Sequence, residues 1–124
     1  MSVSYGKGDK AKATKLHSLV VRSRGACERC GASDYSKLQA AHIIRRTHSA
    51  TRTLEGAAWC LCISCHFAVD NYAHIFMELV EVTIGRDEYD RLYALAKHTP
   101  TKVDWGDELA RLKARWAQIQ EEAA

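Results

Sequence analysis

The chain has 124 residues, of which 47% are hydrophobic, and it contains one proline. This composition excludes a long disordered protein and fits one globular domain. No apolar run reaches about 18 residues, and the polar first fifteen residues lack the apolar segment of a secretory signal, so we expect a cytoplasmic protein without membrane contact. The net charge of +3 is uneven: residues 1–53 carry +8 and residues 54–124 carry −5. A basic half favours a polyanion as partner, nucleic acid first, although a solvated basic tail has the same composition.

The N-terminal half is expected to contain one helix and a buried hairpin. Residues 1–12, rich in Gly, Lys and Ser, predict a flexible basic arm. Apolar residues at helical spacing predict a helix over 14–24. Residues 37–44 end in a short apolar run that is typical of a buried hairpin strand, and residues 56–61 form either its partner strand or a single helical turn.

The C-terminal half is expected to be helical. The pattern predicts one helix over 66–82, with Gly85 as its C-cap, and a second over 86–98. A third helix is predicted over 105–120, capped by Asp104. Two tryptophans of this last segment, Trp105 and Trp116, are expected in the core.

Four of the five cysteines form two Cys-x-x-Cys knuckles, Cys27/Cys30 and Cys62/Cys65. In a reducing compartment such thiols bind metals more readily than they form disulfides. Four thiolates around one ion suit zinc, and two pairs favour a shared metal over a redox motif. We therefore predict a structural zinc. The fifth cysteine, Cys60, is predicted to be a small buried hydrophobe.

Histidine and aspartate side chains remain next to the second knuckle. His66 and Asp70 lie four residues apart on a predicted helix, so they share a face and could hold a second, divalent cation. His74 lies one turn further. The structural alternative is that His66 caps or packs the helix and that the other two are surface residues. His42 ends the predicted strand, where an ordinary core histidine is the alternative.

A basic loop follows His42, and this combination indicates a catalytic role for the histidine. His42 could take a proton from water while a metal on His66 and Asp70 stabilises the charge of a phosphodiester. Nitrogen and oxygen ligands admit Mg²⁺, Mn²⁺, Zn²⁺ or Ni²⁺. The loop residues predicted to contact the DNA backbone are Arg45, Arg46, His48 and Arg52.

The two knuckles CERC and CISC, with the histidine of AAHII and the histidine directly after CISC, resemble the HNH (ββα-metal) endonucleases that carry a four-cysteine zinc. The stretch LQAAHIIRRTHSATR is similar to phage recombination nucleases of the NinG/Rap type. The resemblance implies an α+β, mostly helical fold with a ββα-metal domain over 13–85 and a helical extension over 86–124 packed on it. It also implies a DNA endonuclease in the host-cell cytoplasm, with His42 as general base and His66 as metal ligand.

Two positions depart from the family pattern. Ala57 stands where relatives carry the middle Asn, and Ala41 where many place a metal ligand. Asp70 could replace the ligand, and Glu55 or Asn71 could replace the Asn. The alternatives left open are a degenerate HNH zinc module that binds DNA or recombination intermediates without cutting, and a protein-interaction module. A homodimer through the C-terminal helices and a phage recombination or packaging partner also stay open.

Overall fold

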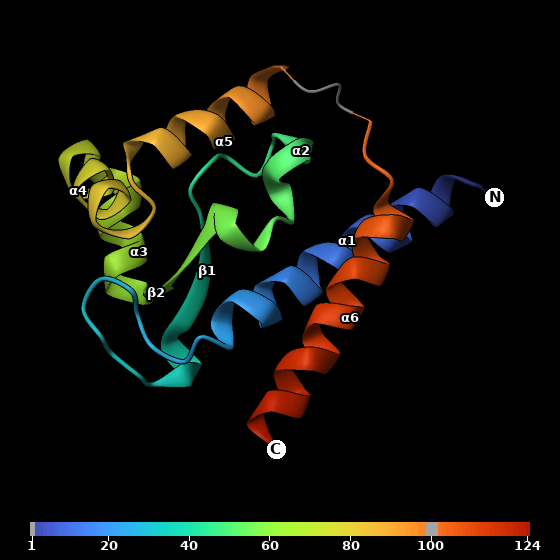
Figure 1. The fold of residues 1–124 in the computed structure, drawn as a ribbon, viewed down its shortest axis with the longest axis horizontal. Coiled ribbons are helices and arrows are strands. Elements are labelled where there is room, and N and C mark those ends of the chain that lie inside the picture. Colours follow the sequence, from blue (N-terminus) through green and yellow to red (C-terminus); the bar gives the residue numbers. More distant parts are fainter. Residues whose placement is uncertain (1, 99–101) are drawn as a thin grey trace.

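The computed structural model describes residues 2–98 and 102–124, and side chains within 8–98 and 102–124. The fold is α+β and mainly helical, with helices arranged around one small antiparallel sheet (Figure 1). Among the described helices none is both long and apolar enough to cross a membrane. The elements in chain order are α1 (Ser2–Arg22), the 3-10 helix η1 (Tyr35–Lys37), β1 (Leu38–His42), α2 (Ser49–Arg52), the 3-10 helix η2 (Glu55–Ala57), β2 (Ala58–Cys62), α3 (Ile63–Asn71), α4 (Ala73–Thr83), α5 (Arg86–His98) and α6 (Trp105–Ala123).

The sheet is a two-stranded hairpin that carries both groups of predicted site residues. Leu38 pairs with Cys62 at one end, and His42 pairs with Ala58 at the other. The expected strand over 37–44 is therefore confirmed in a shorter form. The segment 56–61 contains both of the structures we considered, because a 3-10 turn leads into β2. Strand β2 continues directly into α3, so the second cysteine knuckle lies where the strand ends and the helix begins.

Helix α1 begins at Ser2, well before the helix that we expected over 14–24, so the described backbone of residues 2–12 is helical and not an arm. The buried apolar contacts of α1 lie from Ala13 onward. Ala13 and Val20 are fully buried against α6, while Val21 packs into the core around the sheet. Helix α1 is thereby fixed between two layers, and this packing stabilises a helix whose own propensity is weak.

The C-terminal helices follow the sequence pattern closely. Helix α5 has the predicted bounds, and Gly85 has a φ of 83° and donates its N–H to the carbonyl of Val80, as a helix C-cap does. Asp104 caps α6 by accepting a hydrogen bond from the N–H of Asp107 at 3.0 Å. The single helix expected over 66–82 is wrong, because Tyr72 has extended backbone angles and separates α3 from α4.

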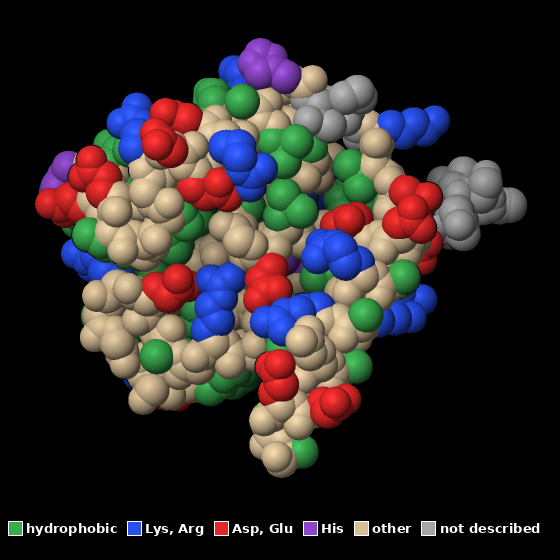
Figure 2. All heavy atoms as spheres, in the orientation of Figure 1, with side chains coloured by type: hydrophobic (Ala, Val, Ile, Leu, Met, Phe, Trp, Pro, Cys, Tyr) green, Lys and Arg blue, Asp and Glu red, His purple; other side chains and the backbone are tan. Residues whose placement is uncertain are grey.

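Helix α6 lies along α1 (Figure 1), so the acidic C-terminal end of the chain covers part of the basic N-terminal end. Leu112 is fully buried in this contact, and Trp105 and Trp116 are partly buried beside it. Arg115 of α6 also forms an ion pair of 2.9 Å with Glu55. Figure 2 shows acidic and basic side chains interspersed over this face. On this face of the molecule, folding therefore mixes the charges of the two halves.

Candidate functional site

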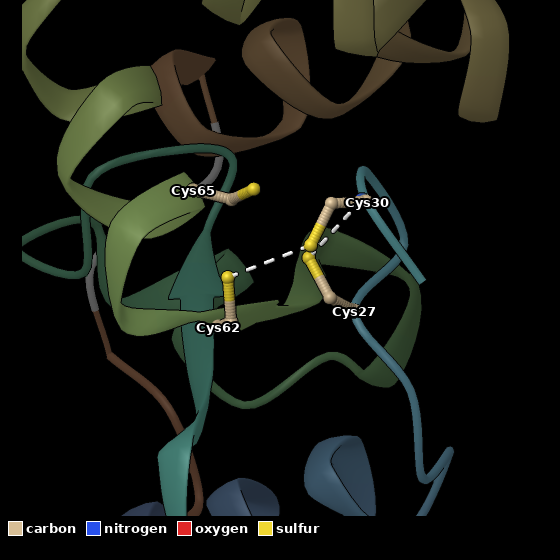
Figure 3. Close-up of side chains that lie close together, drawn as sticks. All are labelled: Cys27, Cys30, Cys62 and Cys65. Atoms are coloured by element: carbon tan, nitrogen blue, oxygen red, sulfur yellow. Dashed lines mark hydrogen bonds between the residues drawn. The ribbon is translucent and has the colours of Figure 1, made fainter. Parts of the chain in front are cut away.

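The four cysteines of the two knuckles converge on one point (Figure 3). Their sulfur atoms all lie within 4.8 Å of one another, and the Sγ atoms of Cys30 and Cys62 are 3.7 Å apart. Tetrahedral zinc with Zn–S bonds of 2.3 Å requires S···S distances of about 3.8 Å. The cluster therefore fits a zinc ion with little movement, and it is the one group of three or more potential ligands among the described residues.

Two thiols of this cluster, those of Cys27 and Cys65, have pKa values shifted in opposite directions. Burial alone would raise the pKa of Cys27, but backbone N–H groups of the knuckles donate to its sulfur and lower that pKa to about 6. Burial and the neighbouring thiols raise the pKa of Cys65. A bound dication would remove this conflict by favouring all four thiolates.

Local contacts hold the first knuckle against the sheet. Gly31 has a φ of 81°, a left-handed conformation that allows the knuckle to turn back. The carboxylate of Glu28 accepts the backbone N–H of Cys60 at 2.6 Å and a guanidinium N–H of Arg24 at 2.7 Å. Cys60 itself is fully buried, lies outside the cluster, and has a pKa raised by burial. Its predicted role as a buried hydrophobe is confirmed.

His66 points away from the cysteine cluster and towards Asp70. Its Nδ1 donates to the side-chain oxygen of Gln39 at 2.6 Å, which leaves a lone pair on Nε2. The Nε2 atom lies 3.3 Å from Oδ2 of Asp70. Two ligands about 2.1 Å from one divalent ion are separated by about 3 Å, so this pair fits a shared cation. Gln39 fixes the ring as a supporting partner commonly fixes a metal-binding histidine.

His42 is held by the backbone. Its Nε2 lies 2.9 Å from the carbonyl oxygen of Arg52, and because a carbonyl can only accept, Nε2 carries the proton. The lone pair is therefore on Nδ1, which has no hydrogen-bond partner within the described chain. Burial lowers the pKa of His42, and the nearby guanidinium of Arg46 lowers it further. A neutral imidazole with one free lone pair is the form that a general base requires.

One cavity of about 500 Å³ brings together most of the predicted site residues. It lies between α1, the sheet and the loop after β1, and His42, His66, Asp70, Arg45 and Arg46 all line it. Both arginines are exposed, and no described acidic residue forms a salt bridge with them. The cavity therefore brings together a histidine with a free ring nitrogen, a histidine–aspartate pair and two arginines that have no acidic partner among the described residues.

Other predicted residues lie outside this cavity. His48 lines an adjoining cavity. The guanidinium of Arg52 donates to Thr14 and to the carbonyl of Arg46, so it fastens the basic loop to α1. Asn71 donates to the carbonyl of Phe67 on its own helix. His74 is exposed on α4, because the break at Tyr72 ends the shared face. Glu55 pairs with Arg115, so neither Glu55 nor Asn71 supports His42.

Two residues that complete the site, Gln39 and His17, carry no signal that sequence reasoning could have used. Gln39 is an ordinary polar residue on the exposed side of β1. His17 of α1 is 1% exposed, and its ring lies 5.3 Å from that of His42 between centroids. Its Nε2 bonds the carbonyl of Leu54 at 3.0 Å, and its buried Nδ1 has no partner. Burial lowers the pKa of His17 to about 4.

Helix α6 supports the segment that positions both histidines. The two accepting carbonyls, of Arg52 and Leu54, flank Thr53. The buried hydroxyl of Thr53 donates to Glu108 of α6 at 2.8 Å, and its carbonyl accepts from Arg111 at 2.9 Å. The C-terminal extension is therefore structurally connected to the candidate site.

Comparison of the chain with protein-family models, with characterised proteins and with solved structures found no match.

Proposed function

We propose that the protein is a metal-dependent endonuclease that hydrolyses phosphodiester bonds of DNA, with an HNH-like ββα-metal site formed by β1, β2 and α3. The observation that carries the proposal is that one cavity contains His42, His66, Asp70 and two unpaired arginines, beside a cysteine cluster that fits structural zinc. The bound cation would stabilise negative charge on the reacting phosphate.

His42 is the general base in this proposal. Its Nδ1 takes a proton from a water molecule as the water oxygen attacks phosphorus and the bond from phosphorus to the leaving sugar oxygen breaks. The leaving oxygen takes a proton from solvent, and the carbonyl of Arg52 holds the ring of His42 throughout. This carbonyl supplies the orientation that relatives obtain from the Asn replaced here by Ala57. The backbone contact is what supports activity despite that departure.

His66 and Asp70 would hold the divalent cation, with Gln39 fixing the histidine. Arg45 and Arg46 would contact phosphate oxygens on either side of the scissile bond, which positions the strand without reading its sequence. The structural zinc would hold His66 in place, since Cys65 is its neighbour in the chain.

The test is nicking of supercoiled plasmid by zinc-loaded protein with added Mg²⁺, Mn²⁺ or Ni²⁺. We expect His42→Ala to lower the nicking rate by about 100-fold or more, the usual contribution of a general base. His66→Ala should also abolish metal-dependent nicking. His74→Ala is the matched control, because this exposed histidine lies outside the cavity. Nicking by His42→Ala at the wild-type rate would contradict the proposal.

A DNA-binding module that does not cut is the second candidate. One observation favours it: His66 and Asp70 are only two protein ligands, and the described chain brings no third to them. Plasmid binding without nicking in any of the metals would select this function.

A further inference from the structure

A second cavity, of about 490 Å³, adjoins the proposed metal cavity and shares His42, Arg45 and Asp70 with it. Its remaining lining residues include Ile44, Val69 and three aromatic rings from α4 and α5, among polar groups that contribute most of its exposed surface. The volume is within the range of pockets that hold small organic groups. A group bound here would lie directly beside whatever occupies the metal cavity.

The aromatic wall is anchored in the core and reaches the surface. Trp59 is 1% exposed and donates to Thr83 at 2.9 Å, and Phe76 packs edge-on against it with ring centroids 5.3 Å apart. Tyr89 packs edge-on against Phe76 at 5.9 Å, and Tyr93 follows at 6.1 Å. Tyr93 is 44% exposed at the end of this series. A ring supported in this way offers a rigid surface at low entropic cost.

Positive charge accompanies the rings. Arg45 lines both cavities, and the ammonium group of Lys97, which lines neither, lies over one face of the Tyr93 ring at 5.4 Å from its centroid. Aromatic rings next to basic groups are the combination that binds unpaired nucleic acid, because each base can stack while its phosphate is neutralised.

We propose that this cavity receives the nucleobase next to the scissile phosphate, so that the substrate is an unpaired polynucleotide strand. The inference rests on the proposed function, because the shared wall of His42 and Asp70 is what places the base beside the reacting phosphate. A base inside duplex DNA is paired and stacked, and it would have to be flipped out at a cost before it could enter. Unpaired DNA avoids that cost.

The test distinguishes the contribution of the bases to binding from the contribution of the phosphate backbone. Zinc-loaded protein without added divalent cation is titrated into two fluorescent strands of equal length, an oligothymidylate and a strand of abasic residues, and binding is followed by anisotropy. Both strands carry the same phosphates. We expect the abasic strand to bind about fivefold or more weakly, the smaller contribution that one stacked base makes. A hairpin duplex should also bind more weakly than the oligothymidylate.

Variants of exposed tyrosines test the role of the ring. Tyr93→Ala should weaken oligothymidylate binding about fivefold or more and leave abasic binding unchanged, whereas Tyr93→Phe should retain wild-type binding. Tyr35→Ala is the matched control, because Tyr35 is 47% exposed and lines neither cavity. Circular dichroism and zinc content verify that each variant is folded.

The outcomes distinguish the inference from the proposed function. Equal binding of thymidylate and abasic strands, or of hairpin and single strand, would overturn the base-binding cavity and leave the nuclease proposal standing. Equal effects of Tyr93→Ala and Tyr35→Ala would do the same. If no strand binds and plasmid is never nicked, the proposed function fails and the inference fails with it.

Discussion

Cys65 and His66 are neighbours in the chain, yet they belong to two sites of different construction. Cys65 is buried in a closed group of four thiols, which leaves no position for a substrate. His66 and Asp70 offer two ligands beside an open cavity, which leaves positions for water and phosphate. Closed ligand sets are typical of structural metals and open sets of catalytic ones. Under the proposed function, two adjacent residues would thus connect the metal that stabilises the fold to the metal that takes part in the chemistry.

The largest expected effect, on folding stability, follows from removing one of the four zinc ligands. Cys62→Ser should lose zinc and unfold the hairpin, because ligation free energies of about 10–16 kcal/mol match or exceed the stability of a small domain. Zinc content by elemental analysis and the far-ultraviolet circular dichroism spectrum measure this. Cys60→Ser is the matched control and should retain zinc. A folded, zinc-free Cys62→Ser protein would show that folding does not require zinc binding by the cluster.

The next effect tests His17, the buried histidine that packs against His42. The pKa of His17 is about 4 when folded and 6.5 when exposed, so the unfolded chain binds a proton first as pH falls. The contribution is fully present above pH 6.5 and is lost as pH falls to 4, and its size is roughly 3 kcal/mol. Arg24, Arg111 and His42 add positive charge around the ring.

Urea unfolding of the wild type and of His17→Phe between pH 7 and pH 4 measures this difference. Acid release of zinc affects both proteins, so only the change in the gap between them reports on His17. The unfolding free energy of the wild type minus that of His17→Phe should fall as pH falls, since only the wild type loses the contribution of His17. A constant gap would show that His17 is not kept neutral by the fold.

A smaller effect should be confined to activity. Gln39→Ala frees the ring of His66, and loss of such a supporting partner costs about 10- to 100-fold in metal affinity or activity. Gln39→Glu keeps an acceptor for the Nδ1 proton and should retain most of the rate. Plasmid nicking as a function of Mn²⁺ concentration checks this, with thermal unfolding unchanged. Equal rates for Gln39→Ala and the wild type would remove Gln39 from the site.

The smallest effect should be on stability alone, with no change at the cysteine cluster or at the His66–Asp70 pair. Asp104→Ala removes the cap of α6 and should cost about 1 kcal/mol of unfolding free energy. Nicking per folded molecule and zinc content should not change. Loss of nicking at constant stability would show instead that α6 acts on the candidate site more directly than through Thr53.

The elements of the chain show which features the sequence could predict. The knuckles, Gly85 and Asp104 depend on local chemistry, and each lies where the pattern indicated. Residue spacing indicated neither the start of α1 at Ser2 nor the break at Tyr72, where one residue has extended backbone angles. His17 lies far from the motifs in sequence, so only the fold could bring its ring beside His42.

The same reasoning applies to the carbonyl that holds His42. From the sequence, only a side chain could be suggested in place of the Asn of the HNH pattern, and Glu55 and Asn71 were the candidates. The structure has a backbone oxygen of Arg52 in contact with the ring instead. Backbone groups are common to all residues, so no sequence pattern marks them.

The most direct measurement of the difference between the two sites is Mn²⁺ binding to zinc-loaded protein, by calorimetry or electron paramagnetic resonance. The wild type and His74→Ala should each bind one Mn²⁺ in addition to one zinc. His66→Ala and Asp70→Ala should keep the zinc and lose the Mn²⁺. Mn²⁺ binding by His66→Ala with wild-type affinity would contradict the open site and leave the cysteine cluster as the one metal centre of the described chain.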